Sequence, residues 1–175
     1  YIDCVLAEYD KLLHYKATMQ GKRFLWYVCC GPEFPNTFLR SSLAESYLIG
    51  VITSFAGLDG FLRWNYTVFN DDPRADIRYY IFPAGDTNFV YPAKNGAPLL
   101  TLRYKALRRG IELYELLERA KEVAPDAAQA AFDTLLHTEK WGDPTALRAL
   151  PATLDYNAYA TVRRNLMLAL SGKQR

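Results

Sequence analysis

Residues 24–30 read FLWYVCC, and residues 31–36 read GPEFPN. The first stretch is apolar throughout and has the length of a β-strand, which predicts a strand that is buried on both faces, as in a parallel sheet. The second stretch is rich in glycine and proline, which neither a helix nor a central strand accommodates. Together they predict a buried strand and a loop that leaves its carboxyl end.

Segments with helical spacing of apolar residues lie on both sides of this strand. One covers residues 5–20 and ends at Gly21, and the next covers residues 39–55 and ends at Gly57. A second strand-like run follows at residues 60–69. The order helix, strand, helix, strand predicts βα units, a parallel sheet, and functional groups on the loops that follow the strands.

Irregular sequence and three further helical segments complete the chain. Pro83, Gly85, Pro92, Gly96 and Pro98 mark a long loop, a kind of segment that is more often functional than idle. Helices are predicted at residues 102–123, with Thr101 as N-cap, at 125–136 and at 153–170. The sequence therefore predicts an α/β fold that ends in helices.

Composition limits the partners and cofactors. With 175 residues the chain can form a domain, but it is too short for a complete barrel of ~250 residues. A net charge of +2 argues against nucleic acid as a partner, and no apolar run approaches the ~20 residues of a membrane span. Two histidines and no CxxC motif predict no metal site, and no cofactor motif is present.

The cysteines do not predict a disulfide framework. Cys4, Cys29 and Cys30 are odd in number. Because Cys29 and Cys30 are neighbours in a strand-like segment, alternation predicts that their side chains point to opposite faces. A disulfide framework is therefore not expected.

Two segments carry polar or aromatic candidates next to a strand. In the loop at 31–36, Glu33 and Asn36 can hold sugar hydroxyls through paired hydrogen bonds, the alternative being that both are simply solvated. In DGFLRWNY, residues 59–66, Trp64 lies near a strand end, where an indole can stack on a sugar ring. The alternative is a core tryptophan, the role that we expect for Trp26.

A third candidate segment is PAGDTNFVYP, residues 83–92. Asp86 and Asn88 precede the aromatic residues Phe89 and Tyr91, although Asp86 can equally serve as the cap of a turn. The sequence contains no glycine-rich phosphate loop, no GxSxG, no HExxH and no close carboxylate pair at a strand end. A complete acid–base apparatus is therefore not visible.

Four ordered blocks resemble the C-terminal part of glycoside hydrolase family 123. They are WYVCCGPEFPNTFLRSSLAESYLIG (26–50), GLDGFLRWNYTVFNDDP (57–73), FPAGDTNFVYP (82–92) and LRYKALRRGIELYELLE (102–118). The resemblance covers residues 24–118. It implies the C-terminal portion of a TIM-like (β/α) barrel over residues 1–123. The helices predicted after that portion form a helical tail over residues 124–175.

The resemblance also implies an activity. Members include β-N-acetylgalactosaminidases, in which the 2-acetamido oxygen of the substrate acts as nucleophile, an Asp orients the acetamido group and an adjacent Glu is the general acid. In the family that pair lies upstream of the matched region, and this sequence contains neither Asp-Glu nor Glu-Asp. No catalytic residue is therefore assigned.

The resemblance implies that the residues present in this chain form one wall of the sugar pocket. Trp64 matches the FLRW block of the family and is expected to line that pocket. The other substrate-binding candidates are Asn65, Tyr66, Glu33, Asn36, Asp86 and Tyr91. The implied partner is a carbohydrate, as a glycan or the sugar of a glycolipid, and the implied location of this bacterial family is periplasmic or secreted.

A second hypothesis remains open, in which the chain is a non-catalytic carbohydrate-binding or structural module. The sequence encoded upstream of Tyr1 distinguishes the two, because only a glycosidase needs an Asp-Glu pair there. The sequence departs from the family at Leu113, where relatives usually have an acidic residue. That position concerns the surface or packing of a helix and leaves the pocket prediction unchanged.

Overall fold

A parallel strand pair with a connecting helix forms the first half of the fold. The computed structural model describes residues 1–93, 96–136 and 152–172. In it β1 (Leu25–Val28) pairs with β2 (Gly60–Arg63), with Leu25 opposite Gly60. Helix α3 (Leu43–Phe55) connects them. The predicted order of strand, helix and parallel strand is confirmed, and the fold is of the α/β class.

Helix α3 is the centre of the molecule. Ser42 and Glu45 form a capping box at its start, in which the Glu45 carboxylate accepts a hydrogen bond of 2.8 Å from the Ser42 backbone N–H. All residues from Ala44 to Phe55 are buried. The helix is therefore covered on every side within this chain.

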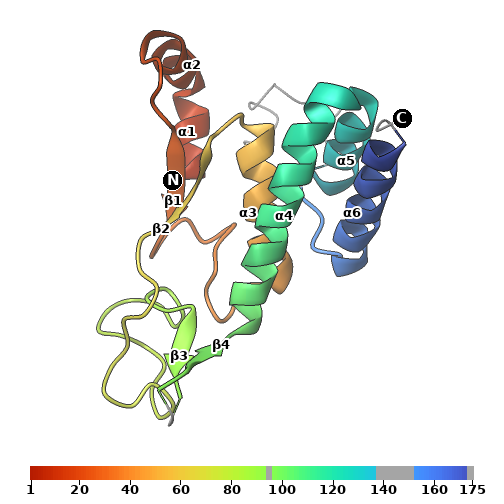
Figure 1. The fold of residues 1–175 in the computed structure, drawn as a ribbon. Coiled ribbons are helices and arrows are strands. Elements are labelled where there is room, and N and C mark those ends of the chain that lie inside the picture. Colours follow the sequence, from red (N-terminus) through yellow and green to blue (C-terminus); the bar gives the residue numbers. More distant parts are fainter. Residues whose placement is uncertain (94–95, 137–151, 173–175) are drawn as a thin grey trace.

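The C-terminal helices cover α3 on the side away from the strands (Figure 1). Helix α4 (Leu102–Val123) crosses it, and α5 (Pro125–Leu136) and α6 (Tyr156–Ser171) pack against α4 and each other. Apolar side chains from these helices, from α1 (Ile2–Ala7), from α3 and from β1 form one core cluster. The predicted domain division at residue 123 falls between α4 and α5 and stays a prediction.

Glycine lets α3 and α4 approach closely. A Cβ atom placed at Gly50 would lie 1.9 Å from the carbonyl oxygen of Gly110, and one at Gly110 would lie 2.6 Å from the carbonyl oxygen of Ser46. These neighbours are backbone atoms, which cannot turn aside as a side chain can. The helix crossing therefore depends on both glycines.

Three expectations about the first half are wrong in detail. The helix expected at residues 5–20 is two helices, α1 (Ile2–Ala7) and α2 (Tyr9–Thr18), because the backbone leaves helical geometry at Glu8. The strand expected at 60–69 ends at Arg63, since the chain there turns toward the β3–β4 hairpin (Val90–Pro92 and Pro98–Leu100). The thiols of the neighbouring Cys29 and Cys30 lie 3.6 Å apart and not on opposite faces, because the strand has already ended at Val28.

The expectation that the first strand is buried on both faces is also wrong. Trp26 and Val28 are buried, which confirms Trp26 as a core residue. On the opposite face Leu25 is 53% exposed, Tyr27 is 42% exposed and Leu62 of β2 is 48% exposed. The physical reason is that core side chains of the helices pack with Trp26 and Val28 on one face, and among the described residues the opposite face of this two-stranded sheet stays exposed.

Within the described residues, no helix combines the length and the apolar character needed to span a bilayer.

Candidate functional site

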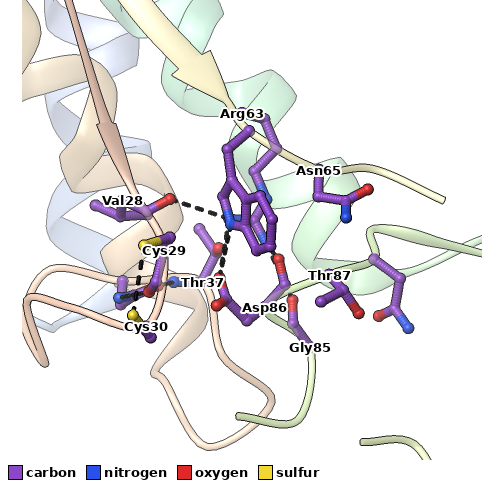
Figure 2. A network of polar contacts seen from close by, with 12 residues as sticks. Val28, Cys29, Cys30, Thr37, Arg63, Asn65, Gly85, Asp86 and Thr87 are labelled. Carbon is purple, nitrogen blue, oxygen red and sulfur yellow. Dashed lines mark hydrogen bonds and ion pairs between the residues drawn. The ribbon is translucent and has the colours of Figure 1, made fainter. Parts of the chain in front are cut away.

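A buried carboxylate joins the end of β2 to the loop that precedes β3. Asp86 is fully buried, and its Oδ1 accepts a hydrogen bond of 3.1 Å from the indole Nε1–H of Trp64. The same oxygen lies 3.4 Å from the Arg63 guanidinium, whose side chain is 5% exposed. The structure thus brings together two of the predicted site residues, Trp64 and Asp86, and adds Arg63. Figure 2 shows Arg63 beside Asp86.

Arg63 fixes this loop by binding backbone carbonyl groups. Its guanidinium donates to the carbonyl oxygens of Val28 at 3.3 Å and Gly85 at 3.2 Å, and also to that of Asp86. These groups belong to β1 and to the loop, and Arg63 itself belongs to β2. One side chain therefore ties the two strand ends to the segment that carries Asp86 (Figure 2).

Arg103, in the first turn of α4, holds the same loop from the other side. It donates to the carbonyl oxygens of Thr37 at 2.6 Å, Gly85 at 2.7 Å and Asn88 at 2.9 Å. Gly85 has φ of +87°, and a Cβ atom there would lie 2.8 Å from the Arg103 guanidinium. Glycine is therefore needed at this position for both its backbone conformation and its lack of a side chain.

The electrostatics of this cluster favour a structural carboxylate. Burial lowers the pKa of Arg63 to about 10, and the nearby Asp86 opposes that shift, so that Arg63 is still protonated at neutral pH. Burial also lowers the pKa of Arg103. Of the two arginines, Arg63 contacts the Asp86 carboxylate through Oδ1, and Oδ2 has no hydrogen-bond partner within the described part of the chain. Its burial and its contacts suit Asp86 to hold Arg63 and Trp64 in place.

Sequence reasoning missed Arg63 and Arg103. A signal existed for Arg63, because a charged residue inside the apolar strand run GFLRW requires buried partners. Both guanidinium groups also lie against the ring of Phe89, at 4.9 and 5.1 Å from its centroid. Phe89 therefore contacts both cations.

Trp64 is partly exposed at the carboxyl end of β2. Its ring contacts Phe82 with a centroid separation of 5.0 Å, and its only N–H group is used by Asp86. The part of the indole that remains for a ligand is its apolar ring surface.

Asn36 and Glu33 have hydrogen-bond and ion-pair partners other than Asp86. Asn36 is fully buried, and its Nδ2 donates to the carbonyl oxygens of Cys29 at 2.9 Å and Pro32 at 2.6 Å. It therefore holds the loop after β1 in shape. Glu33 is exposed and forms an ion pair of 2.7 Å with Arg40, which lowers the pKa of Glu33.

The remaining predicted residues surround the cluster. Asn65 is partly exposed, and its Oδ1 accepts a hydrogen bond from the Tyr66 backbone N–H at 2.9 Å. Tyr66 is exposed and stacks on Phe89 at a centroid distance of 5.8 Å. Tyr91, in β3, is partly buried, and burial raises its pKa.

A cavity of about 520 Å³ lies on the helix side of β2. Its walls come from α3, β2 and α4, and include Phe61, Tyr66, Tyr104 and Tyr114. Tyr66 is the predicted site residue that borders it, whereas Trp64 is not among its lining residues in the described chain. The described residues contain no group of three or more His, Cys, Asp or Glu side chains placed to hold a metal ion.

Comparison with known proteins identifies relatives for most of the chain. The family model described as the catalytic domain of glycoside hydrolase 123 matches residues 4–120. A solved structure from Clostridium perfringens, published as the structural analysis of a family 123 glycoside hydrolase and of glycolipid glycan hydrolysis, has a similar fold with a TM-score of 0.61 and 17% identity. The likeness covers 98% of this chain and 29% of that one. No curated protein sequence matches the chain.

Proposed function

Because the chain belongs to glycoside hydrolase family 123, we propose that it is the C-terminal part of a carbohydrate-cleaving catalytic domain. In this proposal it supplies one wall of the sugar pocket, and the catalytic Asp-Glu pair lies on upstream polypeptide. The substrate is a terminal β-linked N-acetylgalactosamine-type sugar. Hydrolysis proceeds with retention, the 2-acetamido oxygen of the sugar acting as nucleophile.

The observation that carries the proposal is the position of Trp64. Its indole lies at the carboxyl end of a parallel strand, which is the end where α/β folds place their sites, and buried Asp86 holds it by a 3.1 Å hydrogen bond. With its N–H taken, the indole offers an apolar surface that suits the C–H face of a sugar ring. The role of Trp64 is to orient that ring and exclude water from one side of it.

The uncovered sheet face supports a larger domain. Leu25, Tyr27 and Leu62 form an exposed apolar face on a parallel strand pair. Parallel sheets are almost always covered on both faces, and uncovered apolar patches of this kind mark interfaces. If β1 and β2 are neighbouring strands of a TIM-like barrel, these side chains point into its interior. A self-standing binding or structural module would leave them in water.

Variants of the tryptophans test the proposal in the complete catalytic domain. We expect Trp64→Ala to lower kcat/KM per folded molecule for p-nitrophenyl β-N-acetylgalactosaminide by about tenfold or more, which is ~1.4 kcal/mol of transition-state binding. Trp64→Ala and Trp64→Phe both remove the hydrogen bond to Asp86, so that this part of any stability loss is common to the two variants. Trp64→Phe, which keeps an aromatic face, should retain most of the activity.

Trp26 provides the matched control. Its indole is buried and donates to Thr53 Oγ1 at 2.8 Å. Trp26→Phe should therefore lower thermal stability while leaving kcat/KM per folded molecule unchanged. If Trp64→Ala instead lost stability and activity in equal measure, Trp64 would be a core residue and the proposed pocket wall would be wrong.

A further inference from the structure

Two adjacent thiols lie together at the carboxyl end of β1. Cys29 and Cys30 follow Val28 in a bend, and their sulfur atoms are 3.6 Å apart (Figure 2). Cys30 is exposed and Cys29 is partly exposed, so that both can be reached by a small reagent. A regular strand would have separated the two side chains, and the bend brings them onto one side.

The surroundings shift the pKa values of the two thiols in opposite directions. The Tyr1 hydroxyl lies 2.8 Å from the Cys29 sulfur. Burial raises the pKa of Cys29, but hydrogen bonds from Tyr1, from the Cys30 thiol and from two backbone N–H groups outweigh it and lower that pKa below its ordinary value. The hydrogen bond with Cys29 raises the pKa of Cys30. Cys29 is therefore the thiol that reacts first, because the thiolate is the nucleophile.

We propose that Cys29 and Cys30 form a modification site that takes small disulfides and closes reversibly into a vicinal disulfide. The Cys29 thiolate attacks one sulfur of the small disulfide, forms a mixed disulfide and releases one small thiolate. Cys30 then loses its proton to solvent, and its sulfur attacks the Cys29 sulfur and expels the second small thiol. Two protein thiols are oxidised and one small disulfide is reduced to two thiols.

The geometry predicts an easily reduced bond. Adjacent Cα atoms are ~3.8 Å apart, which is shorter than the ~4.4–6.8 Å that ordinary disulfides span. A disulfide closed at this distance is strained, and strained disulfides are the labile ones. The site also adjoins the loop after β1, since the carbonyl oxygen of Cys29 accepts the hydrogen bond from Asn36. This inference does not depend on the proposed hydrolase function.

The test uses the 175-residue chain with Cys4→Ser, which removes the third cysteine. After treatment with excess oxidised glutathione, we expect both thiols to be lost to alkylation, with a mass lower by two hydrogens and no retained glutathione. Reduced glutathione should restore both thiols. Adding Cys30→Ser should leave Cys29 as a stable glutathione adduct. Glutathione adducts on the two-cysteine chain, or covalent dimers in place of ring closure, would overturn the proposal.

The rate of disulfide closure in the folded and in the unfolded chain tests whether the folded structure promotes the reaction. The same reaction is followed in guanidinium chloride, where the chain is unfolded and the bend is lost. We expect closure from the mixed disulfide to be roughly tenfold faster in the folded chain, because the two sulfurs are already adjacent. Equal rates in both states would mean that any adjacent cysteine pair behaves in this way, and would overturn the proposal.

Discussion

Gly50→Ala is expected to lower the free energy of unfolding of the chain by about 3 kcal/mol, although alanine is the better helix former by ~1 kcal/mol. The added methyl group would lie 1.9 Å from the carbonyl oxygen of Gly110 and 2.5 Å from its carbonyl carbon. Because these atoms are backbone, α3 and α4 must separate to make room. The separation loosens core packing along both helices. Chemical denaturation of the two proteins measures the difference.

Gly172→Ala is the matched control for this prediction. Gly172 follows α6 with an ordinary φ of −71°, and a Cβ atom there would meet a carbonyl oxygen at 3.7 Å, which is a normal contact. Its substitution should change stability by no more than ~0.5 kcal/mol. A Gly50→Ala chain as stable as the Gly172→Ala chain would show that α3 and α4 do not cross as closely as described.

Asp86→Leu should have an effect of similar or larger size. Removing one partner of a buried ion pair typically costs ~3–5 kcal/mol, because the other charge stays buried without compensation. Here the stranded charge is Arg63, and Trp64 loses the acceptor of its N–H as well. Asp86→Asn keeps the size and an acceptor oxygen, so that it should be less destabilising than Asp86→Leu.

A double-mutant cycle separates this ion pair from general packing. We expect Asp86→Leu combined with Arg63→Met to be less destabilising than the sum of the single changes, since the second change removes the uncompensated cation. Denaturation curves of the four proteins give the coupling energy. Additive effects would mean that Asp86 and Arg63 are not energetically linked, and the description of Asp86 as the support of the cluster would fail.

The local spacing of apolar residues is sufficient to predict the parallel strand pair and its connecting helix. Alternating strand and helix signals at residues 24–63 predicted the parallel pair, and the capping residues Ser42 and Glu45 flank the start of a helix that apolar spacing had already indicated. Trp26 was recognised as core because its whole segment is apolar. These features depend on neighbours within a few residues, which a single sequence displays.

The supporting cluster could not be predicted in this way. Arg103 binds a carbonyl oxygen 66 positions earlier in the chain, and Asp86 accepts from a tryptophan 22 positions earlier. Which carbonyl group a guanidinium finds depends on how the loop at 83–88 folds back onto the strand ends, and no local spacing encodes that. The exposed face of β1 could not be predicted for a related reason. An apolar strand indicates that both of its faces need to be buried, but it does not indicate which part of the polypeptide packs on each face.

Hydrolysis of p-nitrophenyl β-N-acetylgalactosaminide by the isolated 175-residue chain and by the complete catalytic domain, measured at equal concentrations of folded protein, tests whether the catalytic pair lies outside this chain. We expect turnover by the complete domain and none above the buffer rate by the isolated chain, because the Asp-Glu pair is not in this sequence. Steady turnover by the isolated chain that a single substitution within it abolishes would show that the catalytic residues lie within these 175 residues and that the proposed function is wrong.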